Sequence, residues 1–118
     1  MKYLCSVFFD EKNLDALSEE ERKALDAESL DHDDVLRKGG HLLAAQALQP
    51  VQTATTVRLR GGKVLVTDGP FAETTEQIGG FLLIEARDLN EAIQLASRVP
   101  AIRLGGIEVR PVQELTRG

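Results

Sequence analysis

Residues 67–80, with the sequence TDGPFAETTEQIGG, join two apolar stretches that have the composition of β-strands. A connection between neighbouring strands usually takes about two to five residues of turn-forming types, and this one is longer. It contains carboxylates, hydroxyls, an aromatic ring and a Gly-Pro turn, and it ends in a Gly-Gly pair that lets another backbone come close. Since loops held between strands commonly carry sites, we expect the functional site here.

The chain before this loop predicts a strand, a helix, a second strand and a hairpin. Ser18 and Glu21 have the spacing of a capping box, and Gly39 stands where the helix would end. A Gly-Gly turn between two β-rich runs is typical of a hairpin. The strand at the start is apolar on both faces, which indicates a central strand. The predicted elements are strand 2–9, helix 18–38, strand 41–48 and the hairpin strands 54–60 and 63–67.

The chain after the loop predicts a strand at 80–86, a helix at 89–99 and a last strand at 107–112. Asp88 and Glu91 form a second capping box. Pro111 cannot donate a hydrogen bond to a neighbouring strand, so either the last strand lies at an edge of the sheet or Pro111 lies at the strand's end.

The order of these elements predicts the fold class. Without the hairpin it is β-α-β followed by β-α-β, the split βαβ of α+β ferredoxin-like folds, in one domain over residues 1–118. Both helices would cover one face of the sheet, and nothing in the chain is left to cover the other. A second copy is the simplest cover, so we expect a homodimer with the sheets face to face.

Composition excludes several classes of protein. The net charge of -5 argues against nucleic acid binding, which needs a basic surface. No run approaches the ~18 apolar residues of a membrane span. Cys5 is the single cysteine, so no disulfide forms within the chain, and the start shows no signal-peptide pattern. We therefore expect a cytoplasmic protein.

Asp68 and His32 are the candidate catalytic residues. Asp68 is able to act as a general base or to orient a histidine, and the alternative is a carboxylate that accepts backbone amides of its own turn. His32 falls in the apolar stripe of the first helix. It could relay a proton, or it could be a buried histidine with one hydrogen bond, for which Glu28 is a possible partner.

Four further residues are candidates for binding a ligand: Glu73, Thr74, Glu76 and Arg110. The first three could instead cap a short helical turn before Gly79. Arg110 is expected on the uncovered sheet face, where it could hold a substrate carboxylate or pair with Glu108.

Metal and cofactor sites have no clear pattern in the chain. His32 and His41 fit no standard metal-ligand spacing, and no phosphate-binding glycine motif or nucleophile elbow occurs. We expect neither a metal nor an organic cofactor.

The loop sequence, together with residues 50–58 and 107–112, resembles the DGPF branch of the YCII-related proteins over nearly the whole chain. The resemblance implies a ferredoxin-like subunit that pairs into a dimeric α/β barrel, in a bacterial family often encoded near alternative sigma factors. It also implies a His–Asp pair in an active site, for which His32 and Asp68 are the positions here. Family sequences commonly have Lys where this chain has Thr75.

These observations lead to two hypotheses of function. The first is a protein that binds or transforms a small polar organic molecule in a pocket near the loop, using His32 and Asp68 if it is an enzyme. The second is a non-catalytic dimeric module whose partner is a transcription regulator such as a sigma factor.

Overall fold

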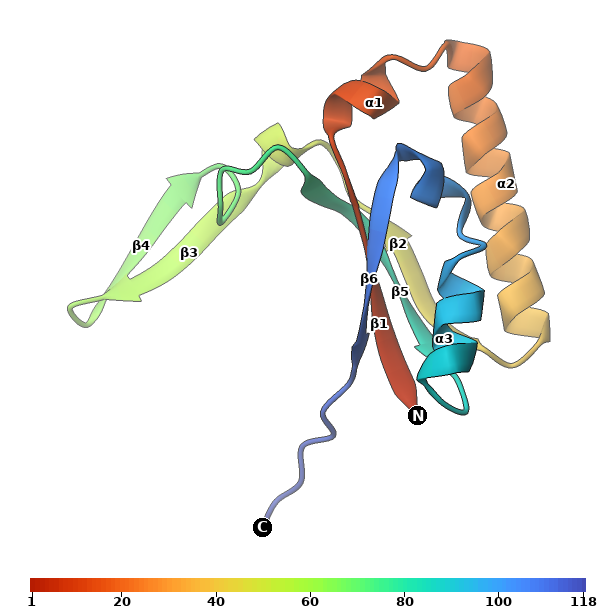
Figure 1. Cartoon of the computed structure of the whole chain (residues 1–118). Helices are drawn as coiled ribbons and strands as arrows, with labels where there is room; N and C mark the ends of the chain where they lie inside the picture. Colours follow the sequence, from red (N-terminus) through yellow and green to blue (C-terminus); the bar gives the residue numbers. More distant parts are fainter.

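The computed structural model describes residues 1–118 as one open β-sheet with helices on one side and a separate hairpin (Figure 1). The α+β class is therefore confirmed. The elements are β1 (Lys2–Phe9), α1 (Glu11–Asp15), α2 (Glu19–Lys38), β2 (Leu42–Ala47), β3 (Thr55–Arg60), β4 (Lys63–Asp68), β5 (Gln77–Glu85), α3 (Leu89–Ala96) and β6 (Gly105–Pro111), with short 3-10 turns at Val51–Thr53 and Pro100–Leu104.

The main sheet has the order β2-β5-β1-β6, and every neighbouring pair of strands is antiparallel. β1 is a central strand, as the sequence predicts, and β6 is an edge strand, which is one of the two predicted alternatives. Within one chain β2 and β6 remain free edges, so the sheet does not close into a barrel. A barrel of the kind that the family resemblance implies would need a second copy.

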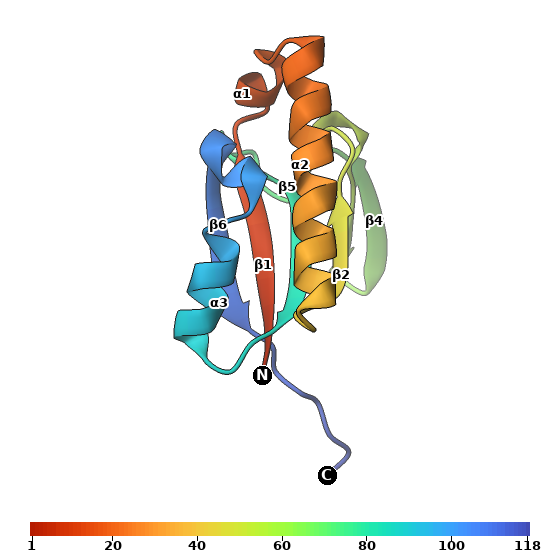
Figure 2. The same cartoon turned by 90° about the vertical axis from the view of Figure 1, so that its right-hand side faces the viewer.

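The helices α2 and α3 cover one face of this sheet (Figure 2). Alternate residues of β1 point into the core on this face: Tyr3, Cys5, Val7 and Phe9. Cys5 is only 1% exposed, and burial raises the pKa of its thiol to about 11. A thiol with a raised pKa in an apolar environment is unreactive, so Cys5 is a structural residue of the core.

The predicted ends of the long helix are confirmed by its hydrogen bonds. The Glu21 amide donates to Ser18 Oγ at 3.1 Å, and the Ser18 amide donates to Glu21 Oε1 at 2.9 Å. Gly39 is the C-cap of α2. None of the helices is long and apolar enough to cross a membrane.

Two short segments differ from the sequence prediction. The sequence predicts no element between the first strand and Ser18, but Glu11–Asp15 form α1, whose N-cap Asp10 accepts a hydrogen bond from the Lys12 amide. A short helical turn before Gly79 was the alternative interpretation of Glu73, Thr74 and Glu76, but β5 already starts at Gln77, which pairs with Phe9. A Cβ on Gly79 would collide with the Phe9 ring, so a larger residue at this strand position would force that ring to move.

The hairpin of β3 and β4, residues 55–68, is called the arm below. Gly61 and Gly62 have positive φ angles of 56° and 76° and form its two-residue turn, as predicted. The arm leaves the sheet on the side away from the helices (Figure 1). The arm and the extended C-terminal segment give the chain a radius of gyration of 16.2 Å, against about 13.5 Å for a compact domain of this length.

Candidate functional site

A groove with a volume of about 980 Å³ lies beside the loop that the sequence singles out. One wall is the loop itself, and the opposite wall is the connection between β2 and β3. Phe8 of β1 and Glu108 of β6 also line it. The remaining lining residues are Leu48, Gln49, Pro50, Val51, Thr53, Ala54, Pro70, Phe71, Ala72, Thr74, Thr75, Glu76, Gln77 and Ile78.

The start of the loop is fixed to the base of the arm. Gly69 has a φ of 116°, a conformation that residues with a side chain rarely adopt. Its amide donates to the Ala54 carbonyl and its carbonyl accepts from Thr56 Oγ1, both at 2.8 Å. This geometry turns the chain out of β4 and directs Pro70 and Phe71 toward the groove.

Arg58 and Gln77 hold the rest of the loop. The Arg58 guanidinium donates to the Phe71 carbonyl at 3.0 Å, and it stacks 4.1 Å from the centre of the Phe71 ring. The Gln77 side-chain amide donates to the carbonyls of Ala72 and Thr74, at 2.8 Å and 3.1 Å. Neither residue was predicted as part of the site, although an amide at the loop's end and an arginine on the hairpin were visible signals.

The opposite wall is held by a contact that links distant parts of the chain. The Val51 amide donates to Glu11 Oε1 at 2.6 Å, so the short helix α1 positions the turn after Pro50. Such contacts leave no periodic pattern in the sequence.

The predicted ligand-binding residues divide into two groups. Thr74 and Glu76 line the groove, whereas Glu73 and Arg110 do not. Arg110 forms an ion pair with Glu108 at 2.8 Å. Of the two roles considered for Arg110, the structure therefore has the pairing with Glu108. Glu108, which the sequence left as a structural partner, is the member of the pair that reaches the groove.

Asp68 is the last residue of β4 and is exposed. It lies opposite Thr55 in the arm, and its carboxylate forms no hydrogen bond or ion pair within the chain. The alternative prediction, that the Asp68 carboxylate accepts hydrogen bonds from amides of its own turn, is therefore wrong. Its carboxylate stands next to the loop without lining the groove.

His32 lies on α2, half-buried on the helix-covered side of the sheet. Glu28 is not its partner, because Glu28 forms an ion pair with Arg103 at 2.8 Å. The arm that carries Asp68 projects from the opposite side of the sheet (Figure 1). One chain therefore does not bring His32 and Asp68 together, and their catalytic roles stay predictions.

Comparison with known proteins now identifies the family. A sequence model of the YCII-related domain matches residues 1–116. The chain belongs to the YCII-related family. It is also 37% identical over 117 residues to "Uncharacterized protein R00369" of Rhizobium meliloti (strain 1021), an alignment that covers 95% of this chain and 92% of the relative.

His32 of this YCII-related chain is expected to make folding stability depend on pH. Burial lowers its pKa below the ordinary 6.5, Arg98 lowers it further, and Asp33 raises it. Below pH 6.5 the unfolded chain binds a proton that the folded chain resists, so stability falls as the pH falls toward the folded-state pKa. Burial raises the pKa of Asp33 above 3.8, so the folded chain binds this proton more readily than the unfolded chain does. In the more acidic range near this pKa, Asp33 therefore makes stability rise as the pH falls.

The variant His32→Gln tests this expectation. Urea unfolding at about pH 7 and about pH 5.5 should show that the unmodified protein loses more stability on acidification than the variant does. Equal losses in the two proteins would show that His32 does not cause the pH dependence.

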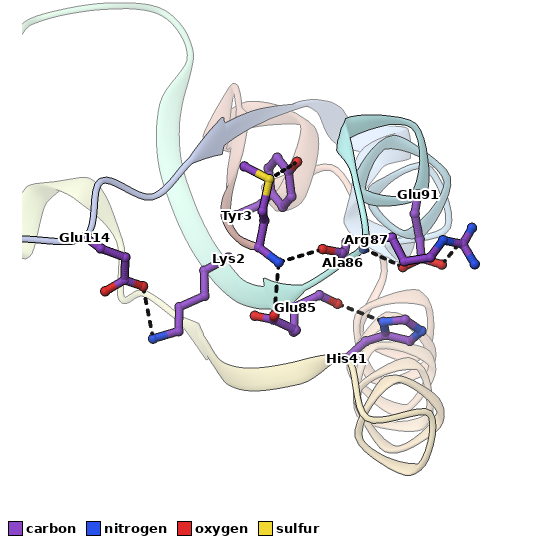
Figure 3. Close-up of polar contacts among 9 residues, drawn as sticks. Lys2, Tyr3, His41, Glu85, Ala86, Arg87, Glu91 and Glu114 are labelled. Atoms are coloured by element: carbon purple, nitrogen blue, oxygen red, sulfur yellow. Dashed lines mark hydrogen bonds and ion pairs between the residues drawn. The ribbon is translucent and has the colours of Figure 1, made fainter.

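His41 has a structural place in this family member. Its Nδ1 donates to the Glu85 carbonyl at 2.8 Å, and the amino group of Met1 lies 3.0 Å from Glu85 Oε1 (Figure 3). These contacts join the ends of β1, β2 and β5 at the far end of the sheet from the groove. No group of three or more His, Cys, Asp or Glu side chains is arranged to hold a metal ion.

Proposed function

We propose that this YCII-related protein is a homodimer that binds a small organic molecule in the groove beside residues 69–76. The observation that carries the proposal is the construction of the loop. Arg58 and Gln77 make five hydrogen-bonding and stacking contacts with Phe71, Ala72 and Thr74. These contacts fix the conformation of the loop beside the groove. A loop that served only to join β4 to β5 would not need such support.

The lining of the groove indicates the class of ligand. Two carboxylates, Glu76 and Glu108, line the groove, and no Lys, Arg or His side chain does. The guanidinium of Arg110 is paired with Glu108, and that of Arg58 is engaged with the carbonyl and ring of Phe71. Phe8 and Phe71 supply apolar surface. We propose a small polar molecule that carries hydrogen-bond donors or a positive charge on an apolar body, such as an organic amine, in preference to an anion.

Surface area supports the homodimer. The chain exposes 8523 Å², whereas a compact monomer of 12.9 kDa exposes about 6300 Å². The arm and the C-terminal segment both project from the sheet and add to this area (Figure 1). A stable interface hides about 800 Å² on each partner, so the excess is large enough for one. The strand order is that of the split βαβ fold, so we propose the ferredoxin-like dimeric barrel of the DGPF branch.

For catalysis we propose a role for Asp68 without His32. Asp68 has an unpaired carboxylate at the start of the loop but does not line the groove, so we propose it as a general base only for a molecule that extends from the groove toward the end of β4. His32 stands behind the sheet, so within one chain the acid–base role is proposed for Asp68 alone.

Binding of small amines to the isotope-labelled protein, followed by NMR, tests the proposal. Aromatic and aliphatic amines should shift the backbone amides of residues 48–54 and 71–77, and matched carboxylates should not. Glu76→Gln should weaken amine binding about tenfold, because a charge-assisted hydrogen bond is lost. Glu73→Gln is the control, since it removes the same charge from the same loop outside the groove. Equal effects of the two variants, or shifts only elsewhere, would contradict the proposal.

A further inference from the structure

The arm has an apolar face that nothing in the chain covers. Cross-strand pairing places Val57 opposite Val66 and Leu59 opposite Val64, so these four side chains share one face. Their exposed fractions lie between 64% and 71%. Two-stranded hairpins are marginally stable alone in water, and an exposed apolar face of this kind marks a contact surface.

The arm is tied to its own chain only at its base. Thr56 donates to the Gly69 carbonyl, Arg58 donates to the Phe71 carbonyl, and the remainder runs free of the sheet (Figure 1). The main sheet offers a second uncovered surface. On its face away from the helices, Leu4 lies opposite Leu83 and Phe8 lies opposite Ile78. Each chain therefore carries two unpartnered apolar surfaces at an angle to one another.

The distribution of charge favours a second copy of the chain as the partner that covers these two surfaces. The arm contains Arg58, Arg60, Lys63 and Asp68, which gives it a net charge of +2. The whole chain has -5, so the remainder carries -7. A basic arm on an acidic body is complementary to the body of another copy and repels another arm.

We propose that the arm of each copy embraces the other copy, with the face formed by Val57, Leu59, Val64 and Val66 packed on the partner outside the partner's own arm. This inference rests on the homodimer proposed above and adds that the arm stabilises it. Phe8 and Ile78 line the groove and also lie on the uncovered sheet face. The partner therefore closes the groove, and the binding site is incomplete in a single chain.

Val66→Lys and Leu65→Lys form a matched pair of variants. The two residues are neighbours in β4, both are exposed, and they point to opposite faces of the arm. Each variant adds the same charge. Val66→Lys should raise the dimer dissociation constant about 100-fold, because it places an ammonium in an apolar contact, and Leu65→Lys should change it by less than about threefold. Sedimentation equilibrium measures both constants.

The sheet-face variant Leu83→Lys separates failure of this inference from failure of the homodimer. Dissociation by Leu83→Lys without dissociation by Val66→Lys would overturn the arm contact and leave the dimer standing. A monomeric unmodified protein would overturn both.

A photo-crosslinking residue at Val64, in a mixture of isotopically light and heavy protein, gives an independent test that needs no destabilised variant. Crosslinks between copies to residues outside 55–68 support the proposal. Crosslinks to the partner's arm, or only within one copy, overturn it.

Discussion

Leu83→Lys is expected to separate the proposed homodimer into folded monomers. Leu83 points to the sheet face that no helix covers, where it lies between Leu4 of β1 and Ala44 of β2. In a monomer the long lysine stem can lie along this face while its ammonium stays in water. In a dimer the ammonium would be buried without a partner, at a cost of several kcal/mol, so the dissociation constant should rise about 1000-fold.

Sedimentation velocity and circular dichroism check this result together. The control is Ile93→Lys, which makes a similar exchange at an exposed position of α3, on the other side of the molecule. Ile93→Lys should leave the dimer intact. A Leu83→Lys protein that stays dimeric, or a control that dissociates equally, would show that the uncovered sheet face is not the interface.

Gly105→Ala is expected to lower the free energy of unfolding by roughly 3 kcal/mol, at the upper end of the usual cost of overpacking. The added Cβ would fall on the carbonyl oxygen of Phe8 and lie 2.8 Å from Cα of Phe9. Both atoms belong to the backbone of the central strand β1, so they cannot move away without breaking its pairing with β6. The effect is steric, because φ of Gly105 is -173°, which any residue adopts.

Gly106→Ala is the matched control for this substitution. It is the next residue in β6, and a Cβ there has no atom within 4 Å. Urea unfolding should give a change of less than about 0.5 kcal/mol for Gly106→Ala. Similar losses for the two variants would mean that β6 does not approach β1 as closely as the structure has it.

Features that depend on neighbouring residues could be predicted from the sequence. Ser18 and Glu21 cap the long helix through contacts three residues apart, and Gly61 and Gly62 supply the positive φ angles of a tight turn. Both are local physics and both were predicted. The α1 helix was missed because its five residues show no apolar periodicity, and its N-cap Asp10 was the one signal present.

Features that depend on distant pairing could not be predicted. Gln77 and Gly79 have the composition of a loop, and they form a strand only because β1 lies beside them. Thr74 and Glu76 were found because they belong to the loop, whereas the wall at Val51 depends on a hydrogen bond from a residue 40 positions away.

The direction in which the arm leaves the sheet is also a property of the whole fold. No local pattern states which side of the sheet an inserted hairpin takes. The predicted pair requires His32 and Asp68 to lie on one side of the sheet, but the elements that carry them, α2 and β4, lie on opposite sides of it (Figure 1).

The mass of the unmodified protein in solution is the most direct test of the proposal that two copies of the chain interlock. Sedimentation equilibrium at micromolar concentration should give twice the chain mass of 12.9 kDa. A mass of one chain, with the apolar faces of the sheet and the arm left in water, would contradict it.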